Sequence, residues 1–333
     1  MDKGSRPESC IVCGGATQAL LGGVVDDRYG CLGKFTIERC GACGHAVTVP
    51  RLQESDLPSL YQQYYPRKNV DLAAIEAEVH RNAERFAVIK RWFSGTDNQG
   101  QFFAKARQDV LDVGCGSCQS LLELKRIGAF AYGVEADPNV KSIAEHFGLN
   151  VHIGSIWDEP FPGTSFDLIV MNQVIEHIPD PEKSLALLVK RLKPAGQLVL
   201  SFPNAGSIYR RISGRHWINW HVPYHQHHFT KRSIAVMAEK LGLRIVRVRT
   251  ITPNLWTVLQ YRNWRAGAAE GRPSDVWGGT ASAPAKVLLG RKVINKSLRI
   301  LLRALNPAIA VVNRAIDAAG FGDSVLVVLS KRH

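Results

Sequence analysis

The chain lacks the apolar segments that would send it into or across a membrane. Its first residues, Met1 to Arg6, contain no apolar core of the kind that a secretory signal requires, and no uninterrupted apolar run approaches the ~18 residues of a membrane-spanning helix. We therefore expect a cytoplasmic protein. In that compartment its seven cysteines are not expected to form disulfides.

The chain is also short of acidic residues. It has 29 Asp and Glu against 42 Lys and Arg, which gives a net charge of +13. Such an excess favours an anionic partner, for which nucleic acid, a membrane surface and a phosphorylated substrate are the candidates, with an ordinary solvated basic surface as the alternative. With 333 residues, 45% of them apolar, the chain is long enough for one large globular domain and an appendage.

Four cysteines form two matching pairs near the N-terminus. Cys10 and Cys13 make the first CxxC turn, Cys40 and Cys43 the second, and each turn is followed directly by glycine. Two such turns predict a closed, structural Zn²⁺ site with four thiolate ligands. His45 is a competing ligand, and four unrelated reduced cysteines are the alternative interpretation. We expect residues 1–50 to form a zinc ribbon with strands over 24–28 and 34–39, stabilised by the metal.

A strand, a glycine turn and a helix start follow one another between Val110 and Cys118. Val110, Leu111 and Val113 are predicted to form a buried strand that contains Asp112, and Gly114 and Gly116 allow a tight turn that brings bare backbone close to a ligand. A second strand ends at Glu135, 19 residues beyond Gly116, where a carboxylate can accept both hydroxyls of a ribose. On this evidence alone a nicotinamide dinucleotide fits as well as any other adenosine cofactor.

Two later segments distinguish a nicotinamide dinucleotide from another adenosine cofactor. Ser165 to His177 is a strand that runs into a Glu176-His177 loop, and Leu192 to Leu200 is a helix end, a turn and a strand. Together with Asp112-x-Gly114-x-Gly116 and Glu135, they make the chain resemble a class I S-adenosylmethionine-dependent methyltransferase over residues 108–250. The resemblance implies that the cofactor contacts Asp112, Gly114, Gly116, Glu135, Ser155, Ile156, Asn172 and Gln173, where loop capping is the alternative role for the last two. Cys118 departs from the family's usual third glycine, so the adjoining loop is expected to be tighter or shifted.

The resemblance implies an α/β fold: a Rossmann-like, seven-stranded class I methyltransferase sheet with an N-terminal zinc ribbon and a helical insertion before the last strand. We expect strands at 151–156, 244–250 and 324–330, the last antiparallel. The domains would be the ribbon (1–50), a helical linker (51–104) with one amphipathic helix over 70–93, the S-adenosylmethionine-binding domain (105–253 and 323–333) and a basic insertion (254–322).

A loop rich in histidine and tryptophan lies between Trp217 and Thr230. Methyl transfer to a hydroxyl, or to a carbon beside a carbonyl, needs a proton acceptor, and histidine suits that role near neutral pH. We predict His225 as the base, with His228 and His177 behind it, and Trp217 and Trp220 as platforms for a sugar ring. The alternatives are that the histidines only pin the loop by hydrogen bonds, or that His221, His225 and His228 bind a metal, for which no carboxylate or cysteine lies nearby in the loop.

Residues 254–322 carry ten Lys and Arg and three Asp and Glu. Residues 286–304 are predicted to form a basic amphipathic helix, and the segment 285–318 could contact the inner face of an anionic membrane, close over the acceptor as a lid, or pair with a second subunit.

An N-terminal ribbon ahead of such a domain is similar to bacterial methyltransferases of sugars and cell-envelope glycans. We therefore expect methylation of a small-molecule or glycan acceptor at oxygen or carbon. The alternatives are an RNA-modifying methyltransferase, which the interleaving of basic and apolar residues disfavours, and a non-catalytic S-adenosylmethionine-binding module.

Overall fold

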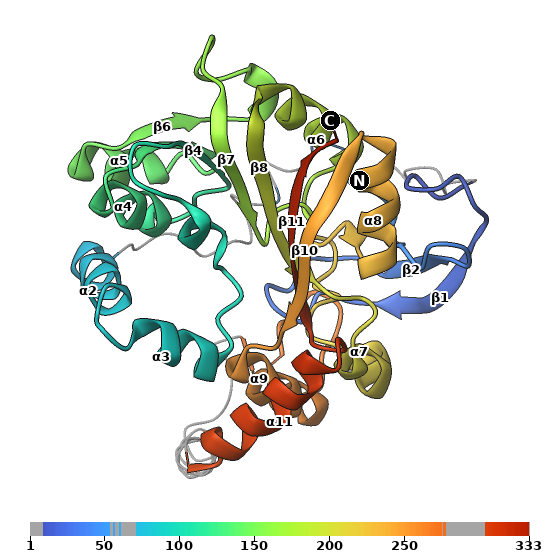
Figure 1. Cartoon of the computed structure of the whole chain (residues 1–333). Coiled ribbons are helices and arrows are strands. Elements are labelled where there is room, and N and C mark those ends of the chain that lie inside the picture. Colours follow the sequence, from blue (N-terminus) through green and yellow to red (C-terminus); the bar gives the residue numbers. More distant parts are fainter. Residues whose placement is uncertain are drawn as a thin grey trace.

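A seven-stranded mixed sheet forms the centre of the molecule (Figure 1). The computed structural model describes residues 9–53, 56, 60, 71–274, 276–277 and 304–332. In spatial order the sheet consists of β10 (Leu243–Ile251), β11 (Ser324–Lys331), β8 (Leu192–Pro203), β7 (Phe166–Asn172), β4 (Asp109–Val113), β5 (Phe130–Glu135) and β6 (Asn150–Ile153). The pairs from β8 to β6 are parallel, whereas β11 runs antiparallel to both β8 and β10. This confirms the predicted α/β sheet with its antiparallel last strand.

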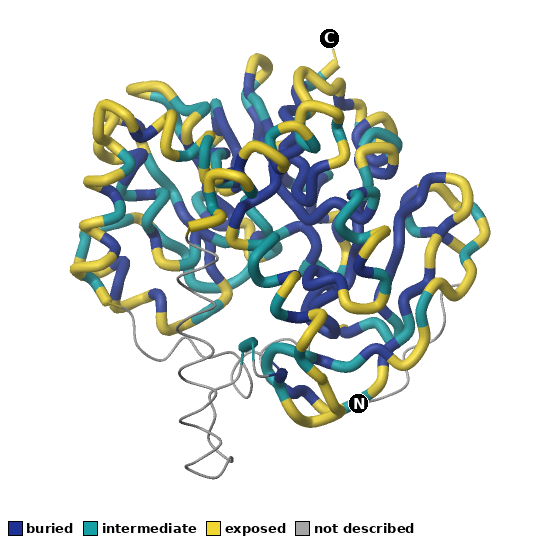
Figure 2. Tube along the Cα trace, turned by 90° about the horizontal axis from the view of Figure 1, so that it is seen from below, coloured by how far each residue is buried: buried dark blue, intermediate teal, exposed yellow. Residues whose placement is uncertain are grey.

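Both faces of the central part of the sheet are covered, because successive residues of a strand point to opposite sides and β7, β8 and β11 are mostly apolar and buried on both. Val110 and Val170 pack on the face of α4 (Gln119–Arg126) and α5 (Val140–Phe147), with Leu121 and Ile143. The opposite face meets α6 (Pro181–Arg191) and α8 (Lys231–Lys240). Its core includes Leu111, Ile169, Met171, Leu185, Leu188, Leu200, Ile234, Met237 and Val327. Figure 2 shows the buried residues concentrated through the centre, with exposed residues around the edge.

The N-terminal segment forms a second sheet of order β1-β2-β3-β9, made of β1 (Thr17–Val24), β2 (Phe35–Cys40), β3 (Ala46–Val49) and β9 (His227–His228). Its fourth strand therefore comes from the histidine-rich loop. The predicted first strand, over 24–28, is wrong. Asp26 is instead the centre of a turn, in which its carboxylate accepts hydrogen bonds from the backbone N–H groups of Arg28, Tyr29 and Cys31.

The single helix predicted over 70–93 is two helices, α2 (Leu72–Asn82) and α3 (Ala87–Ser94). The break follows Asn82, whose carbonyl oxygen accepts a hydrogen bond from the Arg91 guanidinium and whose side chain donates to Glu123 of α4. The Asn82 carbonyl oxygen thus bonds to a side chain and not to the next turn of a continuing helix. As a result two apolar residues of this stretch, Phe86 and Ile89, are 57% and 61% exposed.

A smaller correction concerns the third strand of the domain. It was predicted over 151–156, but β6 ends at Ile153, and Ile156–Asp158 forms a 3-10 turn (η3) capped by the Ser155 side chain. Two other short elements follow β8, namely α7 (Ile208–Ser213) and the 3-10 turn η4 (Gly214–His216). A further 3-10 turn, η2 (Gly100–Phe103), precedes β4.

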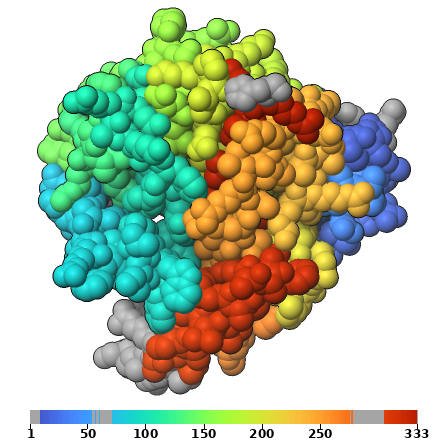
Figure 3. Space-filling model, viewed as in Figure 1, coloured from blue at the N-terminus to red at the C-terminus, as the bar shows by residue number. Residues whose placement is uncertain are grey.

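The insertion before the last strand contains α9 (Asn254–Arg265) and α11 (Asn306–Ala318). Helix α11 contacts α3. It lies below the sheet in Figure 1 and along the lower surface of the molecule in Figure 3. Residues 278–303 lie outside the described residues, and they include nearly all of the predicted basic helix and the part of the proposed membrane-contacting segment that precedes residue 304. Among the helices that the structure describes, none combines the length and the apolar character that crossing a membrane needs.

Candidate functional site

An open cleft of about 1510 Å³ lies at the carboxyl ends of β4, β5, β6 and β7, where ligands bind in open parallel sheets. Segments that follow each of these strands line it. All eight residues predicted to contact the cofactor belong to its wall: Asp112, Gly114, Gly116, Glu135, Ser155, Ile156, Asn172 and Gln173.

Glu135 holds the glycine turn directly. One oxygen of its carboxylate accepts a hydrogen bond from the Gly116 N–H at 2.8 Å, and the other accepts from the Asp137 N–H at 3.1 Å. The backbone of Gly114 has φ +72°, and a Cβ added there would lie 2.5 Å from Val174 Cγ2. Gly116 has φ +56°, but a Cβ there would meet no atom within 4 Å and would enter open space. The turn and the acid predicted to bind the ribose therefore form one unit on the cleft wall.

Asp112 joins this turn to the first turn of α4 by accepting a hydrogen bond from the Ser120 hydroxyl. Burial, with the nearby charges of Glu135 and Glu123, raises the pKa of Asp112 to about 7, although the bond from Ser120 lowers it. Cys118, at the position of the family's third glycine, takes the left-handed conformation (φ +61°) that a glycine would take, and its side chain is fully buried. The cysteine thus keeps a glycine-like backbone at the start of α4.

Asn172 and Gln173 use their polar groups to hold the neighbouring loop. The Asn172 side-chain oxygen accepts from the Gly100 N–H at 3.1 Å, and the Gln173 amide donates to the Asp97 carboxylate at 2.9 Å. These are the loop-capping bonds that were the alternative role for both residues. These two hydrogen bonds attach the segment that precedes β4 to the wall of the cleft.

The histidine-rich loop is bound to the ribbon. The Thr48 hydroxyl donates to the backbone oxygen of His225 at 2.6 Å and lies 3.0 Å from His228 Nε2. The Thr48 N–H also donates to the Gln226 carbonyl at 3.0 Å. The His228 ring lies 6.5 Å from the His225 ring between centroids, but His228 is buried against the ribbon and is not part of the cleft wall, so it is not placed to act as a second base.

The two tryptophans predicted as sugar platforms are core residues. Trp217 and Trp220 are each 2% exposed. The indole N–H of Trp217 donates to the Asp323 carboxylate, and that of Trp220 donates to the Gly214 carbonyl. The stacking prediction is therefore wrong, because both rings are buried in the core and neither lines the cleft. The aromatic residues that do line the cleft are Phe102, Trp157, Trp256 and Trp277.

His177 and His225 do line the cleft, and the structure brings Glu176 to them. One donor atom from each of the three residues lies within 4.8 Å of those of the other two. Burial lowers the pKa of His225 well below 6.5, so its ring is neutral at pH 7, and burial raises the pKa of Glu176 to about 8. Sequence reasoning used Glu176 only as part of a family motif and assigned it no role. The His177 and His225 rings lie 4.7 Å apart between centroids.

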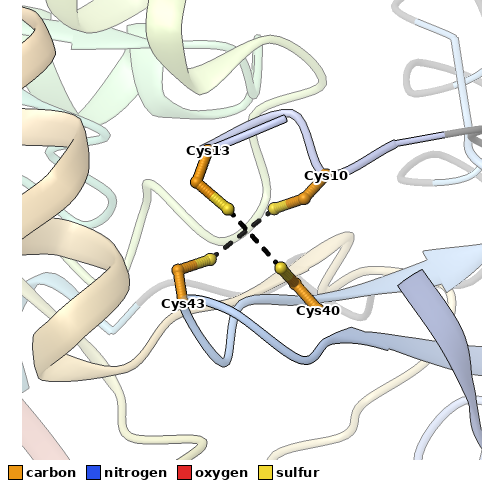
Figure 4. Close-up of side chains that lie close together, drawn as sticks. All are labelled: Cys10, Cys13, Cys40 and Cys43. Carbon is orange, nitrogen blue, oxygen red and sulfur yellow. Dashed lines mark hydrogen bonds between the residues drawn. The ribbon is translucent and has the colours of Figure 1, made fainter. Parts of the chain in front are cut away.

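The four N-terminal cysteines converge on one point (Figure 4). The sulfur atoms of Cys10 and Cys43 are 3.6 Å apart, and those of Cys13 and Cys40 are 3.5 Å apart. A tetrahedral zinc ion with Zn–S bonds of about 2.3 Å would separate its sulfur ligands by about 3.8 Å, so the donor set and the spacing both fit. Burial raises the pKa of Cys40, but hydrogen bonds from the Cys43 N–H and the Cys13 thiol lower it to about 7.

Comparison with known proteins identifies the central part of the chain. Residues 77–248 match the family model described as a methyltransferase domain. The ubiquinone biosynthesis O-methyltransferase of Xanthomonas oryzae pv. oryzae is 30% identical over 129 residues, which are 36% of this chain and 54% of that protein. That of Cereibacter sphaeroides is 30% identical over 130 residues, 37% of this chain and 53% of that protein. The chain spans about half the length of these curated relatives.

Matches to solved structures have low sequence identity and TM-scores below 0.5. An S-adenosylmethionine-dependent methyltransferase from Archaeoglobus fulgidus has a TM-score of 0.42 and 19% identity, covering 75% of this chain and 100% of that one. A TehB-like S-adenosylmethionine-dependent methyltransferase from Corynebacterium glutamicum has a TM-score of 0.38 and 16% identity, covering 79% and 100%.

Proposed function

The chain belongs to the class I S-adenosylmethionine-dependent methyltransferases, and from that premise we propose that it methylates a small-molecule or glycan acceptor at an oxygen or carbon atom. One observation carries the proposal. The glycine turn with Glu135 and the polar cluster of Glu176, His177 and His225 line the same cleft. A cofactor seated on the turn would share this cleft with an acceptor held by the cluster.

The cofactor would be held by backbone and carboxylate groups. Glu135 would accept the ribose hydroxyls, and the turn at Gly114 and Gly116 would lie against the methionine part. S-adenosylmethionine brings an activated methyl group on a sulfonium, so the protein's main task is to position the acceptor in line with it.

The transfer itself needs one proton acceptor. A lone pair of the acceptor oxygen or carbon forms the bond to the methyl carbon, and the electron pair of the carbon–sulfur bond returns to sulfur, giving a neutral thioether. The Nδ1–H groups of His177 and His225 face the backbone oxygens of Tyr224 and Asn219, which can only accept, so in the neutral form of either ring the lone pair is on Nε2. These rings can hold the acceptor's hydroxyl and take its proton.

Two arginine–aromatic pairs on the cleft wall support a glycan or phosphorylated acceptor. The Arg28 guanidinium lies 4.5 Å from the centre of the Trp277 ring, and that of Arg91 lies 3.9 Å from the centre of the Phe102 ring. All four side chains line the cleft. Aromatic rings suit the apolar faces of a sugar, and guanidinium groups suit phosphate oxygens. The names of the curated relatives, which are O-methyltransferases, favour oxygen as the methylated atom.

We propose Zn²⁺ as the ion of the four-cysteine site, with a structural role. Four thiolates leave no coordination position for a substrate. The site lies at the edge of the β1-β2-β3-β9 sheet, so its ion would stabilise the ribbon that holds the histidine-rich loop.

A cytoplasmic location, and contact of segment 285–318 with an anionic membrane, remain predictions. Sedimentation with anionic vesicles tests the contact by comparing the full chain with a deletion of 285–318. If neither protein sediments with the vesicles, the membrane contact is excluded.

The acceptor proposal is tested with labelled methyl groups. The protein is incubated with methyl-labelled S-adenosylmethionine and, in parallel, with nucleotide sugars, lipid-linked glycans, simple phenols and RNA. We expect label in a small-molecule or glycan fraction, and loss of that label in His225→Ala without a change in cofactor affinity. His146→Ala, on the outer surface of α5, is the matched control. Label found in RNA alone would contradict the proposal.

A further inference from the structure

A buried carboxylate without a partner faces the acceptor part of the cleft. Glu176 is 1% exposed, and within the part of the chain that the structure describes neither of its carboxylate oxygens has a hydrogen-bond partner. Both ring nitrogens of the neighbouring His221 are likewise unpartnered among the described residues. An isolated buried carboxylate is costly, and such groups are paired, neutral or bound to a metal. A cation bound beside Glu176 would supply the positive charge that the described residues do not, and would satisfy both carboxylate oxygens.

The two histidines beside it are oriented as metal ligands are. His177 donates its Nδ1–H to the Tyr224 carbonyl at 3.0 Å, and His225 donates its Nδ1–H to the Asn219 carbonyl at 2.9 Å. In metal sites a ligating histidine almost always donates its second ring N–H to a carbonyl or carboxylate, which fixes the tautomer and the direction of the ring. Here both carbonyls belong to the loop that the ribbon holds, so two ligands are fixed by one backbone segment.

We propose that Glu176, His177 and His225 bind a divalent cation at the acceptor end of the cleft. Their donor atoms lie within 4.8 Å of one another, a spread that one ion can bridge. Two imidazoles and one carboxylate suit Mn²⁺, Fe²⁺ or Zn²⁺ better than Mg²⁺ or Ca²⁺, which prefer oxygen donors. Three protein ligands leave coordination positions open toward the cleft, unlike the closed four-cysteine site.

A cation at this position would restrict the kind of acceptor that the protein methylates. Its role in methyl transfer rests on the proposed function. Its open positions would bind two neighbouring oxygens, as in a vicinal diol, a catechol or a hydroxyl beside a carbonyl. The bound cation lowers the pKa of the coordinated hydroxyl. Its O–H bond then breaks with release of the proton to solvent, and the resulting oxyanion forms the bond to the methyl carbon as the methyl–sulfur bond breaks. With the cation bound, the histidine Nε2 lone pairs bind the metal, so solvent takes the proton that the proposed function without a cation assigns to the rings.

The test measures cation binding without any acceptor. The full chain, with Zn²⁺ in the four-cysteine site, is titrated with Mn²⁺ while the free ion is followed by electron paramagnetic resonance. We expect one Mn²⁺ per chain, with an affinity that falls about tenfold or more in Glu176→Gln. Glu182→Gln, which removes a surface carboxylate paired with Lys240 on the same side of the sheet, is the matched control and should bind as the unmodified protein does. If Glu176→Gln does not fold, His177→Gln takes its place, because His177 is only half-buried and its replacement should disturb folding less. The same loss of Mn²⁺ affinity is expected for it.

Three results would overturn the proposal. The first is that the protein binds no Mn²⁺, Fe²⁺ or added Zn²⁺ beyond the zinc of the four-cysteine site, and the second is that the folded variant and the control bind Mn²⁺ with equal affinity. The third is that methyl transfer is unchanged after a chelator has removed every cation except the cysteine-bound zinc. The last result would leave the proposed function intact. If the protein binds Mn²⁺ at Glu176 but methylates none of the acceptors tested, the cation site is supported and the proposed function is contradicted. Failure of the cation site can therefore be told apart from failure of the proposed function.

Discussion

The Thr48 hydroxyl is the contact through which the ribbon fixes the loop of the candidate active site, and its removal should have two separable effects. Thr48 is 1% exposed, and its hydroxyl donates to the His225 carbonyl while lying within hydrogen-bond distance of His228 Nε2. Valine has nearly the same shape but no hydroxyl, so Thr48→Val leaves two buried polar groups without this partner. Each such loss costs about 1–3 kcal/mol, so we expect the free energy of unfolding to fall by about 2–6 kcal/mol.

The second effect is on the position of His225. Because the carbonyl that the hydroxyl holds belongs to His225 itself, methyl transfer should fall about tenfold or more, the size expected for a misplaced reacting group. The affinity for S-adenosylhomocysteine should stay unchanged, since Glu135 and the glycine turn lie on other elements. Urea unfolding measures the stability, calorimetry the affinity, and label transfer the activity.

Two matched variants make the test specific. Thr48→Ser keeps the hydroxyl and should restore most of the stability and the activity. Thr36→Val makes the same substitution on the adjacent strand, at a residue opposite Val49, and should change little. If Thr48→Val matches Thr36→Val in both stability and transfer rate, the coupling between ribbon and loop is refuted.

The remaining predictions concern the cofactor turn and the cysteine site. Gly116→Ala should fold, because a Cβ there meets no atom within 4 Å, but should bind S-adenosylhomocysteine at least about tenfold more weakly by calorimetry, because the methyl group occupies the cleft. Gly114→Ala should instead lose stability in thermal unfolding, since its Cβ would lie 2.5 Å from Val174 Cγ2. Glu135→Gln should weaken binding about 10- to 100-fold, because a charged hydrogen bond is worth about 1.5–3 kcal/mol; an unchanged affinity would contradict the assignment. Removal of the cysteine-bound metal by a chelator should lower the thermal midpoint, and an unchanged midpoint in protein shown by elemental analysis to be metal-free would count against a structural ion.

Features that depend on short stretches of sequence could be predicted. The strand that ends at Val113, the glycine turn and Glu135 were found because an apolar run, two glycines and an acid at a fixed distance reflect backbone rules that act locally. The two CxxC turns were found for the same reason. The antiparallel last strand, Ser324–Lys331, was placed by resemblance to the family and by its apolar run, and the structure pairs it with β8 and β10.

Features that depend on contacts between distant segments could not be predicted. Nothing in residues 46–49 indicates that they pair with His227 and His228, yet this pairing decides which histidines reach the cleft. The carboxylate that the histidine loop lacked is supplied by Glu176, 49 residues before His225 in the sequence. Trp217 and Trp220 were misassigned because the sequence does not distinguish a tryptophan that is exposed on a binding surface from one that is buried in the core.

The most direct measurement of the central claim is a crystal structure of the protein with S-adenosylhomocysteine. We expect the ribose hydroxyls within hydrogen-bond distance of the Glu135 carboxylate, the methionine part against Gly114 and Gly116, and the sulfur directed toward Glu176, His177 and His225. A ligand bound elsewhere, or one whose sulfur is directed away from these three residues, would contradict it.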